Sequence, residues 1–526
     1  MFSSTSGCGT GLDARMSATP CFVGIDLGTS ACKTLAIDGD GRVLARASAD
    51  YSLSTPRPGW AEQSPADWQT GCDAAMGTLV SSLPVGSVVQ AIGLSGQMHG
   101  LVALDRNDRV IRPAILWCDN RTEPECQILT ERVGGLDALL GLTRNRMLPG
   151  FTAGKLLWLG RHEPQALDRM RRFLLPKDAL RLEMTGEYAT DVSDASGTGL
   201  FDVRTRSWST PMLDAVGLLP DQVPVALESH EVTGRLRSAA AMRWGLPPGL
   251  PVVAGGGDSV IQTTSMGVID PGIVGITIGT AGLVGASVAT CPENPGALLQ
   301  VSCGNAPNRW HVMGVTLNGG GAFQWWRDAL SALPCGILSF DEIVALAEQA
   351  PCGADGLLFL PYLLGERCPH VAPAARGAWI GLTRGHDLRH MTRAVMEGVL
   401  LNIRSIVDLV AASGVSRGSL RVSGGATASP IWLQMLADVS GHEVATVTGA
   451  AEGGAYGAAL LAGVGIGHWA SLDEAVEVIK TVGIARPSAE AVAAYDRLHP
   501  IHSSLFGDLR EAVSRLAKFG PEEASC

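Results

Sequence analysis

The chain carries Val-Gly-Ile-Asp-Leu-Gly-Thr-Ser at residues 23–30 and nearly repeats it as Val-Gly-Ile-Thr-Ile-Gly-Thr-Ala at residues 274–281. The two stretches are identical at five of eight positions. Each is an apolar run that ends in a Gly-Thr turn, and after the first turn a second apolar run continues to Asp38. This pattern predicts two strands joined as a hairpin. The repeat predicts two lobes that open with the same hairpin, a duplicated architecture.

Strand and helix patterns alternate between and after these hairpins. Short apolar runs at residues 89–94 and 250–254 predict strands. Helical patterns occupy residues 64–83, 155–161, 387–410, 431–439 and 488–519. The alternation predicts an α/β fold. Because 526 residues exceed what one hydrophobic core usually organises, we expect two lobes with the ligand site in the cleft between them.

These patterns divide the chain into four parts. Residues 1–20 lack the basic start and apolar stretch of a secretory signal, so we expect a loose tail in which Met16 is an alternative translation start. Residues 21–268 form the first lobe, residues 269–500 the second, and residues 501–526 a C-terminal helix and tail. The boundary between the lobes falls near Met-Gly-Val-Ile-Asp-Pro-Gly, in the range 265–275.

Composition excludes several classes of protein. A net charge of −11 without a long Lys or Arg run disfavours nucleic acid and acidic membrane surfaces as partners. Twelve cysteines without a CxxC pair indicate neither a zinc site nor a disulfide framework, and fit reduced thiols in the cytoplasm. The uncharged stretch from Gly272 to Thr290 is broken by Gly-Thr and Gly-Ala pairs, so we expect buried strands and turns there and no membrane span.

The first hairpin could hold a polyphosphate. Asp26 precedes the turn Gly28-Thr29-Ser30, whose N–H groups and hydroxyls can face phosphate while the carboxylate holds hydrated magnesium. The alternative is that the glycine and threonine serve turn geometry alone. The second copy of the turn, at Gly279-Thr280, favours the phosphate interpretation. Lys33 is not part of a P-loop, because no glycine precedes it and strands flank it on both sides.

A glycine run delivers an acid to the end of a strand. Val252-Val-Ala-Gly-Gly-Gly-Asp258-Ser259 is an apolar run followed by three glycines and an aspartate at the start of a probable helix. Open α/β sheets bind ligands at the carboxyl ends of strands. Asp258 is therefore either a helix cap or the group that accepts the proton of an attacking hydroxyl in phosphoryl transfer.

Three further segments are candidates for ligand contact. Gly-Gln-Met98-His99-Gly follows the strand at 89–94, and its alternative role is that of a hydrogen-bonded structural loop. Asp119-Asn-Arg121 is either a polar cluster for hydroxyls or an ordinary surface pair. Gly424-Gly425 can let an adenine lie on glycine backbone, or can be a plain strand-to-helix turn. Without a protein-caged metal pattern, the implied metal is Mg²⁺ bridging nucleotide phosphates.

In this order, the motifs resemble the FGGY carbohydrate kinases, and among them the xylulokinases. The motifs are Gly-Ile-Asp-Leu-Gly-Thr-Ser, Gly-Gln-Met-His-Gly, Leu-Trp-Cys-Asp-Asn-Arg, Gly-Gly-Gly-Asp and Ser-Gly-Gly-Ala. Residues 150–162 are similar to a family signature and residues 361–370 to another recurrent family segment. The resemblance spans roughly residues 21 to 500 and implies two ribonuclease-H-like lobes, as in actin and the sugar kinases, that close about a hinge.

The resemblance also implies roles for single residues. Asp258 would be the catalytic base and would contact the sugar together with Met98 and His99. Asp26 would serve the magnesium site, and the substrates would be ATP and a small sugar, D-xylulose first. The nucleotide contacts would be Gly28, Thr29, Ser30, Gly279, Thr280, Gly424 and Gly425.

Two departures from the family pattern affect the choice of sugar. Ser259 stands where an asparagine is common, and Asn120 stands where relatives have glycine. Another ketose or a polyol is therefore the first alternative substrate. A non-catalytic sugar-responsive regulator is the alternative from another functional class, and a homodimer is a further possibility for assembly.

Overall fold

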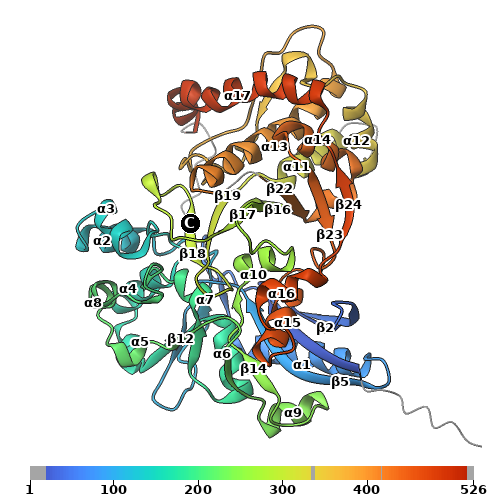
Figure 1. The fold of residues 1–526 in the computed structure, drawn as a ribbon. Helices are drawn as coiled ribbons and strands as arrows, with labels where there is room; N and C mark the ends of the chain where they lie inside the picture. Colours follow the sequence, from blue (N-terminus) through green and yellow to red (C-terminus); the bar gives the residue numbers. More distant parts are fainter. Residues whose placement is uncertain (1–18, 333–337, 416–417, 518–526) are drawn as a thin grey trace, which may run out of the picture.

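The computed structural model describes residues 19–332, 338–415 and 418–517, and it consists of two lobes (Figure 1). Most of the expected N-terminal tail, including Met16, lies outside the described residues. Each lobe is built on a seven-stranded mixed sheet. The expected α/β fold with two duplicated lobes is confirmed.

The first sheet begins with the expected hairpin. Strand β1 pairs antiparallel with β2 and parallel with β5, and β14 and the short β15 continue the parallel side next to β5. The strands are β1 (Thr19–Leu27), β2 (Ala31–Asp38), β3 (Val43–Asp50), β5 (Ser87–Gly96), β13 (Val232–Arg235), β14 (Pro251–Val253) and β15 (Gly256–Gly257). Its main helices are α1 (Pro65–Ser81), α4 (Thr152–His162), α6 (Pro176–Thr185), α7 (Val192–Ser196), α9 (Ser238–Trp244) and α10 (Asp258–Ser265).

The second sheet repeats this pairing scheme. Strand β16 pairs antiparallel with β17 and parallel with β22, as β1 does with β2 and β5. The strand order is β18-β19-β17-β16-β22-β23-β24. The strands are β16 (Ile273–Ile278), β17 (Gly282–Val288), β18 (Gln300–Cys303), β19 (Trp310–Thr316), β22 (Ser419–Ser423), β23 (Val444–Val447) and β24 (Thr481–Ala485). The sequence repeat therefore marks a duplicated fold.

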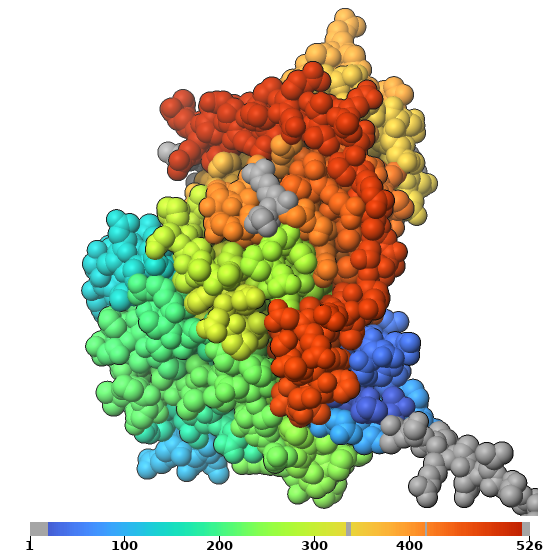
Figure 2. Space-filling model, in the orientation of Figure 1, coloured from blue at the N-terminus to red at the C-terminus, as the bar shows by residue number. Residues whose placement is uncertain are grey.

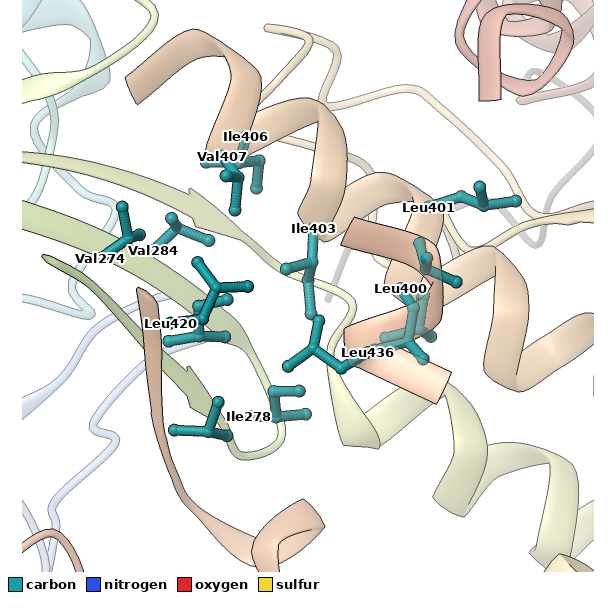
Figure 3. Close-up of a cluster of buried hydrophobic side chains, with 14 of the residues drawn as sticks. Val274, Ile278, Val284, Leu400, Leu401, Ile403, Ile406, Val407, Leu420 and Leu436 are labelled. Carbon is teal, nitrogen blue, oxygen red and sulfur yellow. The ribbon is translucent and has the colours of Figure 1, made fainter. Parts of the chain in front are cut away.

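A long buried helix forms the core of the second lobe (Figure 3). Helix α13 (Leu388–Ala412) contributes Leu400 and Ile403 to a hydrophobic cluster that also contains Val274 of β16 and Leu436 of α14 (Pro430–Ser440), and all four side chains are almost fully buried. Burying one such side chain contributes about 1.5–3 kcal/mol. Leu420 and Val422 of β22 belong to the same cluster, so it joins β16 and β22 to the helices of the second lobe.

One helix from late in the chain returns to the first sheet. Helix α15 (Gly454–Gly465) crosses β1 and β5, and Figure 2 shows its neighbourhood in red beside the blue N-terminal strands. The backbones touch because glycines lie beneath the helix. A Cβ on Gly24 would lie 1.8 Å from the carbonyl oxygen of Ala455, and one on Gly93 would lie 2.0 Å from that of Ala458. The first sheet is therefore covered by a segment from the second half of the sequence.

The chain ends in helix α17 (Ala489–Leu516), which lies across the second lobe (Figure 1). It continues through Pro500, so a single helix crosses the position at which we expected the C-terminal part to begin. The other helices of the second lobe include α11 (Gly320–Ser331) and α12 (Phe340–Glu348), while α16 (Leu472–Ala475) packs beside α15 at the first lobe (Figure 1). Within the described ranges, every helix is too short or too polar to span a lipid bilayer.

Candidate active site

The parallel strands of the first sheet bring two carboxylates to one edge. Asp26 is next to last in β1, and its register partner in β5 is Ser95. Ser95 is in turn paired with Gly256 of β15, and Asp258 follows that strand directly. The Ser95 hydroxyl donates to Asp26 Oδ1 at 2.7 Å. Carboxyl ends of parallel strands lie at the same edge of a sheet, which explains why residues far apart in sequence meet here.

Burial raises the pKa of both carboxylates, and the charge of Asp26 raises that of Asp258 further. The pKa of Asp258 is raised to about 7, mainly by burial and secondly by the negative charge of Asp26, against the N–H of Ser259. Burial also raises the pKa of Asp26, while the Ser95 hydroxyl and the Lys33 ammonium oppose that shift. A carboxylate that is half protonated near neutral pH is suited to taking up a proton during a reaction.

Both carboxylates line a cavity of about 640 Å³ between the lobes. The first lobe contributes Asp26 and Lys33, and the second contributes β16, the end of β22 and the loop before α15. The lining residues are Asp26, Lys33, Asp258, Ser259, Gln262, Thr277, Leu283, Val422, Ser423, Gly424, Thr427, Thr446, Val447, Ala450, Ala451, Glu452, Gly453 and Gly454. The cavity confirms the cleft that the sequence predicted between two lobes.

A second cavity of about 360 Å³ lies in the second lobe, beyond the turn after β22. Gly424 lines the first cavity and Gly425 the second, so this turn separates them. Gly424 has a φ of 90°, and an added Cβ would lie 2.4 Å from the carbonyl oxygen of Ile278, so only glycine fits there. The second cavity is lined by Ile278, Gly279, Thr280, Gly320, Gly321, Phe323, Gln324, Phe340, Asp341, Val344, Gly425, Ala426, Ala428, Ser429 and Trp432. A lining that combines glycine backbone with aromatic rings suits a flat apolar group.

The Met98-His99 loop lies beside Asp258. The Ser259 hydroxyl donates to Met98 Sδ at 3.1 Å, so the loop touches the first turn of α10. The His99 ring places Nδ1 2.6 Å from the carbonyl oxygen of Gly197, which fixes the proton on Nδ1 and leaves Nε2 as an acceptor. Burial lowers the pKa of His99 to about 3, so the ring is neutral. His99 is partly exposed, but among the described residues neither Met98 nor His99 lines either of these cavities.

The Gly28-Thr29-Ser30 turn is placed differently from its neighbour Asp26. Among the described residues, none of these three lines either cavity. The Thr29 hydroxyl accepts a hydrogen bond from Trp117 Nε1 at 2.9 Å, and the Gly28 carbonyl accepts one from the Tyr51 hydroxyl at 2.6 Å. In this arrangement the turn is fastened to the rest of the first lobe, and only Asp26 and Lys33 of the hairpin face the cavity.

Asp119 and Arg121 form a buried ion pair. Both side chains are fully buried, and Arg121 Nη2 lies 2.6 Å from Asp119 Oδ2. The guanidinium also lies 3.5 Å from the centre of the Trp60 ring. This finding corrects both sequence interpretations of the segment, because the pair is neither on the surface nor open to sugar hydroxyls.

Some residues of the site were not singled out from the sequence. Ser95 could have been found as a polar residue at the end of a predicted strand. Gly453 and Gly454 open α15 toward the cavity, and a Cβ on Gly454 would lie 2.8 Å from Asp26 Oδ1. Their signal is a glycine pair ahead of an alanine-rich helical run. Trp432 carried no signal, because an aromatic residue in a helix is far more often part of a core.

Comparison with known proteins gives one consistent family. The model of the FGGY family of carbohydrate kinases, N-terminal domain, matches residues 21–265, and the model of that family's C-terminal domain matches residues 274–466. The chain is 40% identical over 474 residues to the xylulose kinase of Escherichia coli (strain K12), covering 90% of this chain and 96% of that protein. It is 38% identical over 493 residues to the xylulose kinase of Klebsiella pneumoniae, covering 94% and 100%.

A solved structure agrees with the sequence matches. The crystal structure of xylulose kinase from Rhodospirillum rubrum superposes with a TM-score of 0.87 at 30% sequence identity, covering 94% of this chain and 99% of that one. Family models match both lobes, and the relatives are similar over nearly their whole length. The chain therefore belongs to the FGGY family of carbohydrate kinases.

Proposed function

We propose that this chain transfers the γ-phosphoryl group of ATP to D-xylulose and releases D-xylulose 5-phosphate and ADP. The observation that carries the proposal is the position of Asp258, which lies in the cavity between the lobes with the Met98-His99 loop beside it. The relatives similar over nearly the whole chain are xylulose kinases, which supports D-xylulose as the sugar.

Asp258 is the proton acceptor in this proposal. Its carboxylate takes the proton of the sugar's terminal hydroxyl while that oxygen forms a bond to the γ-phosphorus. The bond from the γ-phosphorus to the bridging oxygen breaks, and the electron pair leaves with ADP. The transition state of phosphoryl transfer is loose, so the base mainly orients the hydroxyl. A pKa of about 7 lets Asp258 accept the proton near neutral pH.

The sugar lies between Asp258 and the Met98-His99 loop. His99 Nε2 is available to accept a hydrogen bond from a sugar hydroxyl, because Nδ1 is held by Gly197. The Met98 side chain offers an apolar contact, and it is 6% exposed. A neutral acceptor and an apolar face together bind a small polyhydroxylated molecule without adding charge beside the base.

ATP lies mainly on the second lobe. The adenine of ATP fits the smaller cavity at Gly425, Gly279 and Thr280. The phosphates pass Gly424 into the larger cavity. The N-terminus of α15 at Gly454 points into the larger cavity, where its N–H groups favour phosphate. We propose that Gly28, Thr29 and Ser30 contact the phosphates only when the lobes close.

A divalent cation suits the carboxylates of the larger cavity. Asp26 and Asp258 both line it, and the charge of Asp26 contributes to the raised pKa of Asp258, so a cation beside Asp26 relieves an existing repulsion. Mg²⁺ prefers carboxylate oxygen, water and phosphate oxygen as ligands, and Asp26 is the residue that would hold it. When bound, Mg²⁺ neutralises charge on the ATP phosphates and sets their orientation.

The expectations that remain predictions concern organisation and assembly. We propose that residues 21–268 supply the sugar side and residues 269–500 the ATP side, with α15 as the segment that returns to the first sheet. The cytoplasmic location and the homodimer also remain predictions. Another ketose or a polyol remains the first alternative substrate, since Ser259 touches the Met98 side chain and so influences the pocket.

The test is a coupled assay of ADP release with D-xylulose, L-xylulose, D-ribulose, L-ribulose, D-fructose and glycerol. We expect turnover with D-xylulose that falls by about two to four orders of magnitude in Asp258→Ala. If the chain prefers another sugar, that sugar replaces D-xylulose as the proposed substrate, and the proposed kinase activity stands. Binding of a sugar without turnover on any of them would favour the regulator.

A further inference from the structure

Lys155 is a buried cation behind the sugar loop. Its side chain is fully buried in α4, and Nζ donates to the carbonyl oxygen of His99 at 2.7 Å and to that of Gly150 at 2.6 Å. Within the described part of the chain, no carboxylate forms an ion pair with it. A buried ammonium is normally neutralised by an acidic partner. Lys155 instead donates its hydrogen bonds to two backbone carbonyl oxygens.

One of these carbonyls belongs to a strained residue. His99 has a φ of 69°, in the left-handed region that residues other than glycine seldom occupy. The Thr152 hydroxyl donates to the same carbonyl oxygen at 3.0 Å. Two donors from α4 therefore hold the His99 peptide from behind. The ring is fixed in front by Gly197 and packs on Phe151, with 4.8 Å between ring centres. Strained backbone at a ligand site persists only where its surroundings hold it.

We propose that Lys155 is a positioning residue for sugar binding, whose ammonium fixes the His99 peptide and thereby the ring that meets the sugar. The inference rests on the proposed function, because it takes His99 as a sugar contact. Lys155 touches no substrate itself. Its effect is therefore expected on sugar affinity and not on ATP affinity.

The charge of Lys155 changes within the working pH range. Burial is the main cause that lowers the pKa of Lys155 to about 7. The charged and titratable groups that face it are Asp119, Cys118 and Cys126, which favour the cation, Arg121, which disfavours it, and His99, whose own pKa is lowered in part by Lys155. Asp119 is already paired with Arg121. The neutral amine holds the two carbonyls less strongly than the ammonium does, so sugar affinity should fall as the pH rises through about 7.

A purely structural role predicts a different pH dependence. A lysine whose pKa is lower in the folded than in the unfolded state favours folding more as the pH rises between those two values. Lys155 thus makes the protein more stable at alkaline pH while it makes sugar binding weaker. Opposite trends of melting temperature and sugar affinity distinguish positioning of His99 from simple stabilisation.

The test is the equilibrium binding of D-xylulose without ATP, by calorimetry from about pH 6 to about pH 8.5. Asp258→Asn serves as the background, because it removes the other group that titrates near neutral pH. We expect the Kd of this background to rise about fivefold to tenfold over the range. Added Lys155→Arg should make the Kd independent of pH, and Lys155→Met should weaken binding already at pH 6. Thr152→Val is the matched control, which should weaken binding at every pH and keep the slope.

Each outcome decides the inference. A Kd that does not change with pH, or a folded Lys155→Met with unchanged affinity, overturns it. If Lys155→Met does not fold, the slopes of Asp258→Asn and Thr152→Val decide alone. If D-xylulose does not bind, the sugar with the highest turnover replaces it. If no sugar of the panel binds any variant, the proposed function fails together with the inference.

Discussion

Ser193→Ala should lower turnover by disturbing the backbone that carries the base. The Ser193 hydroxyl is fully buried and accepts a hydrogen bond from the N–H of Gly257, the residue before Asp258, at 3.1 Å. It also donates to Asp191, which retains two backbone donors of its own. The substitution leaves the Gly257 N–H buried without a partner, which costs about 1–3 kcal/mol. The protein relieves that cost by moving β15, and Asp258 moves with it.

We expect kcat with D-xylulose to fall about tenfold to a hundredfold, because small displacements of a positioned group cost about that much. KM for ATP should stay within about twofold. Ser229→Ala is the matched control: Asn305 Nδ2 donates to both hydroxyls, at 3.3 Å to Ser193 and 3.0 Å to Ser229, but only Ser193 is bonded to Gly257. Wild-type kcat in Ser193→Ala, with a melting temperature lowered as in Ser229→Ala, would refute the reasoning.

Three further predictions address pH and the nucleotide cavity. Since the pKa of Asp258 is raised to about 7, kcat at saturating sugar should rise as the pH increases through that value. The raised pKa also means that the ionised Asp258 lowers stability above it, so Asp258→Asn should melt at a higher temperature than wild type at pH 8 and not at pH 4. Burial lowers the pKa of His311 to about 4, and neither ring nitrogen has a hydrogen-bond partner among the described residues. Because the unfolded state binds the proton more readily, wild type should lose stability as the pH falls from about 6.5 to about 4. His311→Leu should lose less stability in the same melting experiments. Gly425→Val should raise KM for ATP about tenfold without lowering the melting temperature. Gly425 lines the smaller cavity, and an added Cβ meets no protein atom within 4 Å, so the new side chain occupies space in that cavity. An unchanged KM in the coupled assay would show that ATP does not use this cavity.

The features that could be predicted from the sequence are those with a local signal. The two Gly-Thr hairpins follow from alternating apolar runs and turn residues, and their pairing is found as expected. Asp258 follows from a strand that ends in glycines, and helix α10 begins at that residue as the pattern indicates. In each case the deciding contacts lie within about ten residues, so local propensity and periodicity are sufficient.

The covering of the first sheet by α15 had no such signal. The alanine-rich run that forms α15 predicts a helix but does not indicate which sheet it covers. The complementary features are Gly24 and Gly93, hundreds of positions earlier, which let the helix backbone approach within contact distance. A glycine in a strand has several possible causes, including a bulge or a turn. The match becomes visible only when the three segments are seen together.

A buried ionic cluster in the first lobe shows why charged residues in a sequence do not reveal whether they are exposed. Lys177 Nζ lies 2.6 Å from Asp178, 2.7 Å from Asp191 and 3.0 Å from Asp194, and all four side chains are fully buried. The three carboxylates are close enough together to hold a metal ion, but the ammonium of Lys177 already lies among them. In a sequence, such residues indicate a solvated surface, because charged side chains are rarely buried unless they are paired.

This cluster is placed where it can control the geometry of the reaction. Arg181, paired with Asp178, donates to the carbonyl oxygen of Ala254 at 2.9 Å, between β14 and β15. Asp191 accepts the hydroxyl of Ser193, which in turn holds the N–H of Gly257. The backbone that carries Asp258 is therefore hydrogen-bonded at both ends of its glycine run to this buried polar cluster. Removing one charged side chain from a buried cluster leaves the other charges unpaired and destabilises the protein. A conservative change such as Ser193→Ala therefore tests the positioning of Asp258 without unfolding the lobe.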